Sequence, residues 1–175
     1  MCDLGAFFGG SKPEFERVTT HSLATIFIMV LSVAGSVLAQ TDPFVGTWKL
    51  NVKKSKFVPG PPMKSEIRIV SPGPLGMDIS VKRVNGDSNM EEFEYTANLD
   101  GKSYPVTGQG PYGANSIAAN LTTPYRIQST FRRDNSVVAT STSLVSNSGM
   151  VLTITTKGTD TTGKPFSSIA VYDKQ

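Results

Sequence analysis

Apolar and polar residues alternate in short runs along the chain from Gln40 onward, and turn signals separate the runs. Met77, Ile79 and Val81, for example, are spaced two apart, which is the period of a strand with one buried face. The sequence Asn-Gly-Asp at 85–87 follows them and favours the positive φ angles of a tight hairpin. No run of ten residues after Gln40 has apolar residues three and four apart, so we predict no helix of ordinary length there.

This pattern predicts about ten strands, and the short links between them favour antiparallel neighbours. The predicted strands are 44–51, 65–70, 77–81, 91–96, 104–106, 116–121, 125–132, 136–146, 151–157 and 166–172. In the second of these, Ile67 and Ile69 share one face. A meander of this length exposes two edges unless it closes on itself. We therefore predict an all-β fold, an antiparallel up-and-down (meander) β-barrel of about 8–10 strands. A β-sandwich is the alternative.

Two of the predicted strands carry polar patterns that bear on the interior. The run 91–96 places Phe93 and Tyr95 on one face and Glu92 and Glu94 on the other, so these two glutamates are expected to face water. The run 139–143 carries hydroxyl groups on both faces. Either these hydroxyls line a hydrated cavity, which supplies their hydrogen-bond partners, or the strand lies at an exposed end of the barrel.

The N-terminal part has a different character from the rest of the chain. An uncharged apolar run of sixteen residues covers 23–38, with Lys12 and Arg17 ahead of it and small residues behind it. These features are typical of a secretory signal peptide. A transmembrane anchor is the alternative, but the run is shorter than the roughly 20 apolar residues that a bilayer core requires. We predict a signal peptide at 1–39, with an over-extended start, and a single exported domain at 40–175.

The predicted location of the domain is the periplasm or the extracellular space, with no stable membrane insertion after signal cleavage. Its strands lack the paired aromatic girdles of an outer-membrane barrel. The chain has a formal net charge of +3, and its basic residues are scattered apart from the short runs 53–56 and 132–133. Scattered charges of this kind give no basic stripe for a phosphate backbone, so no nucleic-acid partner is predicted.

The chemistry available to the domain is limited. The only cysteine is Cys2 and the only histidine is His21, and both precede the predicted domain. Without them the domain has no Ser-His-Asp or Cys-His arrangement, and no imidazole or thiolate metal ligand. We therefore predict no enzyme, no cofactor and no metal site. A carboxylate mechanism is the one catalytic alternative left open, and Glu91, Glu92 and Glu94 are clustered in the sequence.

The start of the predicted domain, Gly46-Thr47-Trp48-Lys49-Leu50, resembles the first strand of the lipocalin and fatty-acid-binding-protein (calycin) superfamily. The resemblance implies that Trp48 is a packing residue that closes one end of a lipocalin-like barrel. The domain as a whole is similar to small exported bacterial lipocalin-like proteins of unassigned function. That similarity rests on the same start, on the stretch 98–106 and on the ending 171–175.

The last predicted strand resembles the closing strand of the fatty-acid-binding branch, which places an Arg and a Tyr two residues apart, facing the ligand carboxylate. Tyr172 matches the tyrosine, but Ala170 stands at the position of the arginine. The helical lid of that branch has no counterpart, because 53–62 is short and contains Pro-Gly-Pro-Pro. The resemblance thus implies a ligand-binding barrel with an altered head-group site.

Our hypothesis is an exported barrel that binds a small lipophilic or amphipathic ligand. The candidate ligand-binding residues are Trp48, Phe93, Tyr95, Arg126 and Tyr172. Arg126 either points inward, as a polar anchor for an acidic ligand, or outward, as a surface residue. The apolar residues on the other face of its strand favour the outward alternative.

The alternative is a periplasmic or cell-surface structural or interaction protein with a filled barrel and no ligand. In that case function resides in loops such as 108–113, where Tyr112 is a plausible contact residue for a protein partner that the sequence does not identify.

Overall fold

The structure, a computed structural model, describes residues 42–175. The predicted signal peptide, residues 1–39, lies outside the described residues. Between 42 and 175 the chain forms eleven strands and two short 3-10 helices. These elements are β1 (Gly46–Leu50), η1 (Val52–Lys54), β2 (Lys56–Val58), β3 (Ser65–Gly73), β4 (Gly76–Val84), β5 (Met90–Ala97), β6 (Asp100–Gly108), η2 (Pro111–Gly113), β7 (Ser116–Thr123), β8 (Arg126–Arg133), β9 (Ser136–Val145), β10 (Val151–Thr159) and β11 (Pro165–Lys174). Within this range, neither helix is long and apolar enough to cross a membrane.

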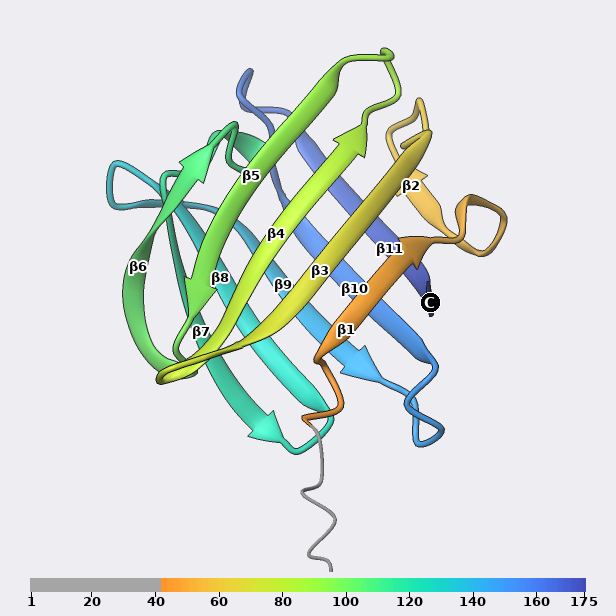
Figure 1. Cartoon of the computed structure of the whole chain (residues 1–175). Coiled ribbons are helices and arrows are strands. Elements are labelled where there is room, and N and C mark those ends of the chain that lie inside the picture. Colours follow the sequence, from red (N-terminus) through yellow and green to blue (C-terminus); the bar gives the residue numbers. More distant parts are fainter. Residues whose placement is uncertain (1–41) are drawn as a thin grey trace, which may run out of the picture. The chain divides into compact units, whose positions relative to one another are not determined.

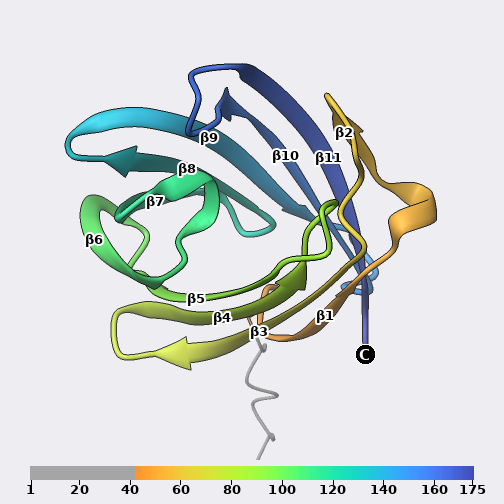
Figure 2. The same ribbon diagram turned by 90° about the horizontal axis from the view of Figure 1, so that it is seen from above.

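Ten of the strands form a closed antiparallel meander. From β3 to β11 each strand pairs with the next, and β1 pairs with β3 on one side and β11 on the other (Figure 1). Figure 2 shows the strands surrounding a common interior. The predicted antiparallel up-and-down barrel is confirmed, and the alternative of a β-sandwich is wrong.

The short strand β2 extends the closing seam. The C-terminal part of β11 pairs with β1, and residues Ser167, Ser168 and Ile169 of β11 pair with β2. The helix η1 lies between β1 and β2 and has only three residues. This is the position at which the sequence analysis expected no helical lid. The segment 51–58 therefore continues the barrel wall.

Several strands are longer than the sequence predicts, and two of them, β3 and β6, contain residues that are typical of turns. The strand β3 continues to Gly73, and Pro72 lies opposite Met77 in the register with β4. The turn itself consists of only two residues, 74 and 75, between paired Gly73 and Gly76. Similarly, β6 begins at Asp100, where Asp-Gly indicated a turn.

One end of the barrel is filled by apolar side chains around Trp48, which is 0% exposed. The indole Nε1 donates a hydrogen bond to the backbone oxygen of Phe44 at 2.8 Å. The Nζ atom of Lys174 lies 5.0 Å from the centre of the indole ring. Other buried members of this cluster are Val70, Met77, Ile79, Ala97, Ile127, Val145 and Leu152. This cluster is the larger of the two apolar clusters in the described part of the chain.

A second, smaller apolar cluster forms around Phe131, Ile117 and Ala139. Tyr112 of η2 packs on it: its ring stacks on Phe166 with centroids 4.4 Å apart and meets Phe131 edge-on at 6.0 Å. The interior of the barrel lies between these two clusters.

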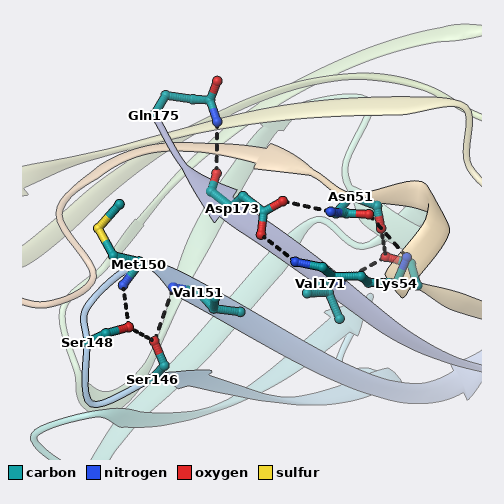
Figure 3. Close-up of polar contacts among 10 residues, drawn as sticks. Asn51, Lys54, Ser146, Ser148, Met150, Val151, Val171, Asp173 and Gln175 are labelled. Carbon is teal, nitrogen blue, oxygen red and sulfur yellow. Dashed lines mark hydrogen bonds and ion pairs between the residues drawn. The ribbon is translucent and has the colours of Figure 1, made fainter.

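A polar contact fixes the seam where the barrel closes. The carboxylate of Asp173 on β11 accepts hydrogen bonds from Asn51 Nδ2 at 2.7 Å and from Lys54 Nζ at 3.3 Å (Figure 3). The hydroxyl of Ser55 accepts a bond from the amide of Val171 at 2.9 Å. Both contacts join the segment after β1 to the last strand, more than a hundred residues later in the chain.

Candidate functional site

The strand β3 turns its polar side chains inward. Glu66 is 2% exposed, whereas Ile67 and Ile69 are each 46% exposed on the outer surface. In the register, Arg68 lies opposite Trp48 of β1 and Val81 of β4, both fully buried. Directly opposite residues in a sheet share a face, so Arg68 faces the barrel interior as well. The apolar face of this strand is therefore the outer one.

Glu66 and Arg68 belong to one buried hydrogen-bond network. The hydroxyl of Tyr172 donates to Glu66 Oε1 at 2.8 Å, and Arg68 Nη2 donates to the same oxygen at 2.9 Å. Arg68 Nη1 donates to the hydroxyl oxygen of Tyr95 at 3.0 Å. The network thus joins β3, β5 and β11 across the interior, with one carboxylate, one guanidinium and two phenols.

The environment keeps the donors of this network protonated. Burial alone lowers the pKa of Arg68, but the oxygens of Tyr95 and Glu66 outweigh it, and the pKa lies well above its ordinary value. Burial, and then the charge of Glu66, raise the pKa of Tyr172 well above its ordinary value. Arg68 therefore stays cationic and the Tyr172 hydroxyl keeps its proton.

A second ion pair lies beside the first. Arg83 on β4 is opposite Glu66 in the register, and its Nε donates to Glu91 Oε2 at 2.6 Å. The guanidinium carbon of Arg83 lies 5.0 Å from the ring centre of Phe93. Glu66 and Glu91 thus balance the charges of Arg68 and Arg83.

The opposite wall carries a row of hydroxyls. Ser129, Ser141, Thr156 and Ser168 are successive cross-strand partners on β8, β9, β10 and β11. Ser141 is 8% exposed and Thr156 is 3% exposed, so this row lies inside the barrel. The sequence left two interpretations of the hydroxyls at 139–143, an interior cavity or an exposed end of the barrel. The structure supports the first, because Ser141 and Ser143 line an interior cavity.

The network and the hydroxyl row line a cavity of about 50 Å³. A second cavity of about 40 Å³ lies toward the apolar end, and Arg68, Tyr95 and Ile154 contact both. A water molecule needs on the order of 10–15 Å³ of such space, so the cavities hold water or a small group. The Nε of Arg68 is buried and, among the described residues, has no hydrogen-bond partner. This N–H group can therefore donate one further hydrogen bond.

A wide groove of about 1130 Å³ lies outside the cavity, between the β4–β5 turn and the segment 108–115. Arg83 and Tyr112 line both this groove and the inner cavity, so these two side chains separate them. Tyr112 has a φ of 62°, a conformation that costs a bulky residue energy. Arg133 holds the loop through bonds to the backbone oxygens of Tyr112 at 2.6 Å and Gly113 at 3.0 Å. Tyr112 therefore fills the mouth of the barrel, whereas the sequence suggested an exposed contact residue.

Three of the five candidate residues, Phe93, Tyr95 and Tyr172, line the inner cavity. Trp48 lies in the packed end and lines neither cavity. Arg126 is exposed on the outer face of β8, because its neighbour Ile127 takes the inward position at 5% exposure. The hypothesis of Arg126 as an inward anchor is therefore wrong.

The inward-facing charged residues that the sequence reasoning missed are Glu66, Arg68 and Arg83. The signal was present in β3, where Glu66, Arg68 and Val70 also repeat at a period of two. It was ambiguous because isoleucines occupy the other face of the same strand.

The three clustered glutamates do not converge on one site. Glu92 and Glu94 are exposed, as predicted, and Glu92 pairs with Lys82 at 3.2 Å. Glu91 instead pairs with Arg83 at the mouth. Within residues 42–175, no group of three or more His, Cys, Asp or Glu side chains is placed to hold a metal ion.

No protein-family model matches the sequence, and no curated protein matches it. Among solved structures, the chain is similar to the zebrafish ileal bile acid-binding protein crystallised with cholic acid. The two chains share 9% identity, and the similarity covers 76% of this chain and 99% of that chain with a TM-score of 0.44. Similarity at this level does not identify a ligand for this chain.

Proposed function

We propose that the barrel binds a small amphipathic molecule in its interior. The observation that carries the proposal is Arg68, which lines both interior cavities and whose buried Nε has no hydrogen-bond partner within residues 42–175. A buried donor without an acceptor costs about 1–3 kcal/mol, and a ligand oxygen placed there recovers that energy. The hydroxyl row opposite offers further polar contacts, and Phe57, Phe93 and Ile154 offer apolar ones.

The size of the cavity sets a condition on binding. Pockets that bury whole small molecules usually measure about 300–1,000 Å³, well above the interior space in this conformation. Tyr112 stands between the cavity and the outer groove, so its withdrawal joins the two spaces. We expect binding to require movement of the segment 110–113, with Arg133 as the contact that must loosen.

Export is part of the same proposal. Its support is the apolar run 23–38 with its basic lead, which is typical of a signal peptide. N-terminal sequencing of the protein recovered from fractionated cells tests it: a mature N-terminus at Gln40 in the exported fraction is expected. An intact N-terminus in the cytoplasmic fraction contradicts export without touching the binding proposal.

Titration of the purified protein with Nile red, a neutral lipophilic dye, tests the binding function. Saturable binding near 1:1, displaced by unlabelled medium-chain alcohols, is expected. The matched variants are Ser141→Val, on the cavity wall, and Thr140→Val, its exposed neighbour on β9. Ser141→Val should weaken displacement by the alcohols several-fold, because one polar contact is lost, and Thr140→Val should leave it unchanged.

The second candidate is the filled barrel, a structural or interaction protein without a ligand. The observation that favours it is the small volume of the two cavities. A flat response to the dye and the alcohols, with near-UV circular dichroism showing a folded protein, would reject interior binding and support this candidate.

A further inference from the structure

The donors that would bind a ligand carboxylate in the interior, Arg68 and Tyr172, already bind Glu66. Glu66 Oε1 accepts from both Arg68 Nη2 and the Tyr172 hydroxyl, at 2.9 and 2.8 Å. Glu66 itself is 2% exposed and comes from the strand that also supplies Arg68. To bind this guanidinium and this phenol, a ligand carboxylate would have to displace the carboxylate of Glu66, which lies two residues before Arg68 on the same strand.

The charges around the cavity are balanced before any ligand arrives. Arg68 pairs with Glu66 at 2.9 Å, and Arg83 pairs with Glu91, with side chains of Arg68, Glu66 and Arg83 no more than 12% exposed. A ligand carboxylate would add a third negative charge to two positive ones. Burying a charge without a counter-charge is unfavourable by several kcal/mol, even after the surroundings relax.

The polar groups left for a ligand suit an uncharged oxygen. Arg68 Nε is a single donor, and the hydroxyls of Ser129, Ser141 and Thr156 both donate and accept. A carbonyl oxygen accepts from such a set without adding charge, and a hydroxyl does so while also donating to a serine. An alkyl or aryl body attached to that oxygen packs against Phe93 and Ile154.

Resting on the proposed interior binding, we infer that the barrel selects uncharged ligands with a carbonyl or hydroxyl oxygen, such as alcohols, aldehydes, ketones or esters. The same interior discriminates against carboxylates of the same size. Glu66 is the specificity-determining residue, because it fills the anion position that a carboxylate ligand needs.

The experiment compares n-alcohols with n-alkanoates of equal chain length, by displacement of Nile red at mildly alkaline pH, where the alkanoates are ionised. We expect each alcohol to bind at least about tenfold more tightly than its alkanoate, a difference of about 1.4 kcal/mol. Equal or tighter binding of the alkanoate overturns the inferred selectivity and leaves interior binding standing. Failure of both series overturns the proposed function together with this inference.

The variant Glu66→Gln removes the internal anion while nearly preserving its shape. Alkanoate affinity is expected to rise at least about tenfold in this variant, because Arg68 is left without a counter-charge, while alcohol affinity changes much less. Glu92→Gln, an exposed glutamate on β5, is the matched control and should change neither. An unchanged alkanoate affinity in a folded Glu66→Gln protein contradicts the role of Glu66. If that variant does not fold, the comparison on the unmodified protein still decides.

Discussion

The hydroxyl of Tyr172 is one of two donors to a carboxylate that is almost completely buried. Hydrogen bonds to charged groups contribute more than neutral ones, typically about 1.5–3 kcal/mol. Tyr104 offers a natural contrast, since its hydroxyl donates to Asp100 at 2.9 Å in an exposed position. Bulk water can replace the donor there, whereas Glu66 is only 2% exposed.

The replacement Tyr172→Phe should therefore lower the free energy of unfolding by about 1.5–3 kcal/mol, because Glu66 loses a donor. Tyr104→Phe should change it by less than about 0.5 kcal/mol. Urea denaturation followed by circular dichroism measures both. Equal effects of the two replacements would show that the buried network contributes no more than a surface contact.

The sequence predicts an inward residue correctly where the inward face of the strand is apolar, and misses it where that face carries charged residues. Phe93 and Tyr95 were placed correctly, because they alternate with the exposed Glu92 and Glu94. Arg68 was missed because a charged residue between isoleucines is ordinarily outside the core. Only the register, which sets Arg68 opposite Trp48 and Val81, shows that it lies inside.

At the scale of elements, the short helix η2 depends on one arginine for its position. Arg133 on β8 bonds the backbone oxygens of Tyr112 and Gly113, and the turn is otherwise held by backbone bonds such as Ala114 N to Pro111 O at 3.0 Å. Its pattern of Gly and Pro predicted a loop, as found in part. The inward orientation of the Tyr112 ring depends on its contacts with Phe131 of β8 and Phe166 of β11. These contacts are far apart in the chain, so no local sequence pattern predicts them.

Arg133→Gln should speed hydrogen exchange at the amides of Gly113 and Ala114 by about tenfold, because the loop opens more easily once both bonds are lost. Exchange in the strands should change little. Arg132→Gln, the neighbouring position, is the control and should leave the loop amides unchanged. Uniform acceleration across the barrel would mean that Arg133 supports the whole fold instead of the loop.

At the same scale, Asp173 joins β11 to the segment after β1. Its pKa is lowered first by the hydrogen bond from Asn51 and then by that from Lys54. Because the folded pKa lies below the unfolded one, this contribution to stability is complete above the ordinary aspartate range. It is lost as the pH falls through the lowered value.

Stability of the unmodified protein should thus fall more steeply with acid than that of Asp173→Asn, and the two curves should converge at low pH. Urea midpoints measured from about pH 6 down to about pH 2 test this. Asp87→Asn, in an exposed turn, is the control and should follow the unmodified protein. Parallel curves for the parent protein and Asp173→Asn would refute the role of this contact.

For the whole molecule, the polar interior lowers stability relative to an apolar one. Replacing a complete buried ion pair by apolar residues of similar volume is often neutral or stabilising by about 1–4 kcal/mol, whereas removing one partner destabilises by about 3–5 kcal/mol. The triple variant Glu66→Leu, Arg68→Met, Tyr172→Phe should accordingly be at least as stable as the parent.

Glu66→Leu alone should be markedly destabilised, because Arg68 is left buried without its counter-charge. Thermal and urea unfolding compare the two variants, and the triple variant should also lose binding of alcohols. A triple variant that is several kcal/mol less stable than its parent would show that the network is needed for folding as well as for the proposed ligand binding.

The outward isoleucines of β3 give the chain a competing state during folding. Sliding β3 by one residue along its neighbours would bring Ile67 and Ile69 inside and release Glu66 and Arg68 to solvent. That misregistered barrel would gain apolar burial, so hydrophobicity alone selects the wrong alignment. The native alignment depends on the two-residue turn between Gly73 and Gly76, which fixes the pairing of β3 with β4. A longer turn at 74–75 would therefore produce a mixture of two differently aligned barrels.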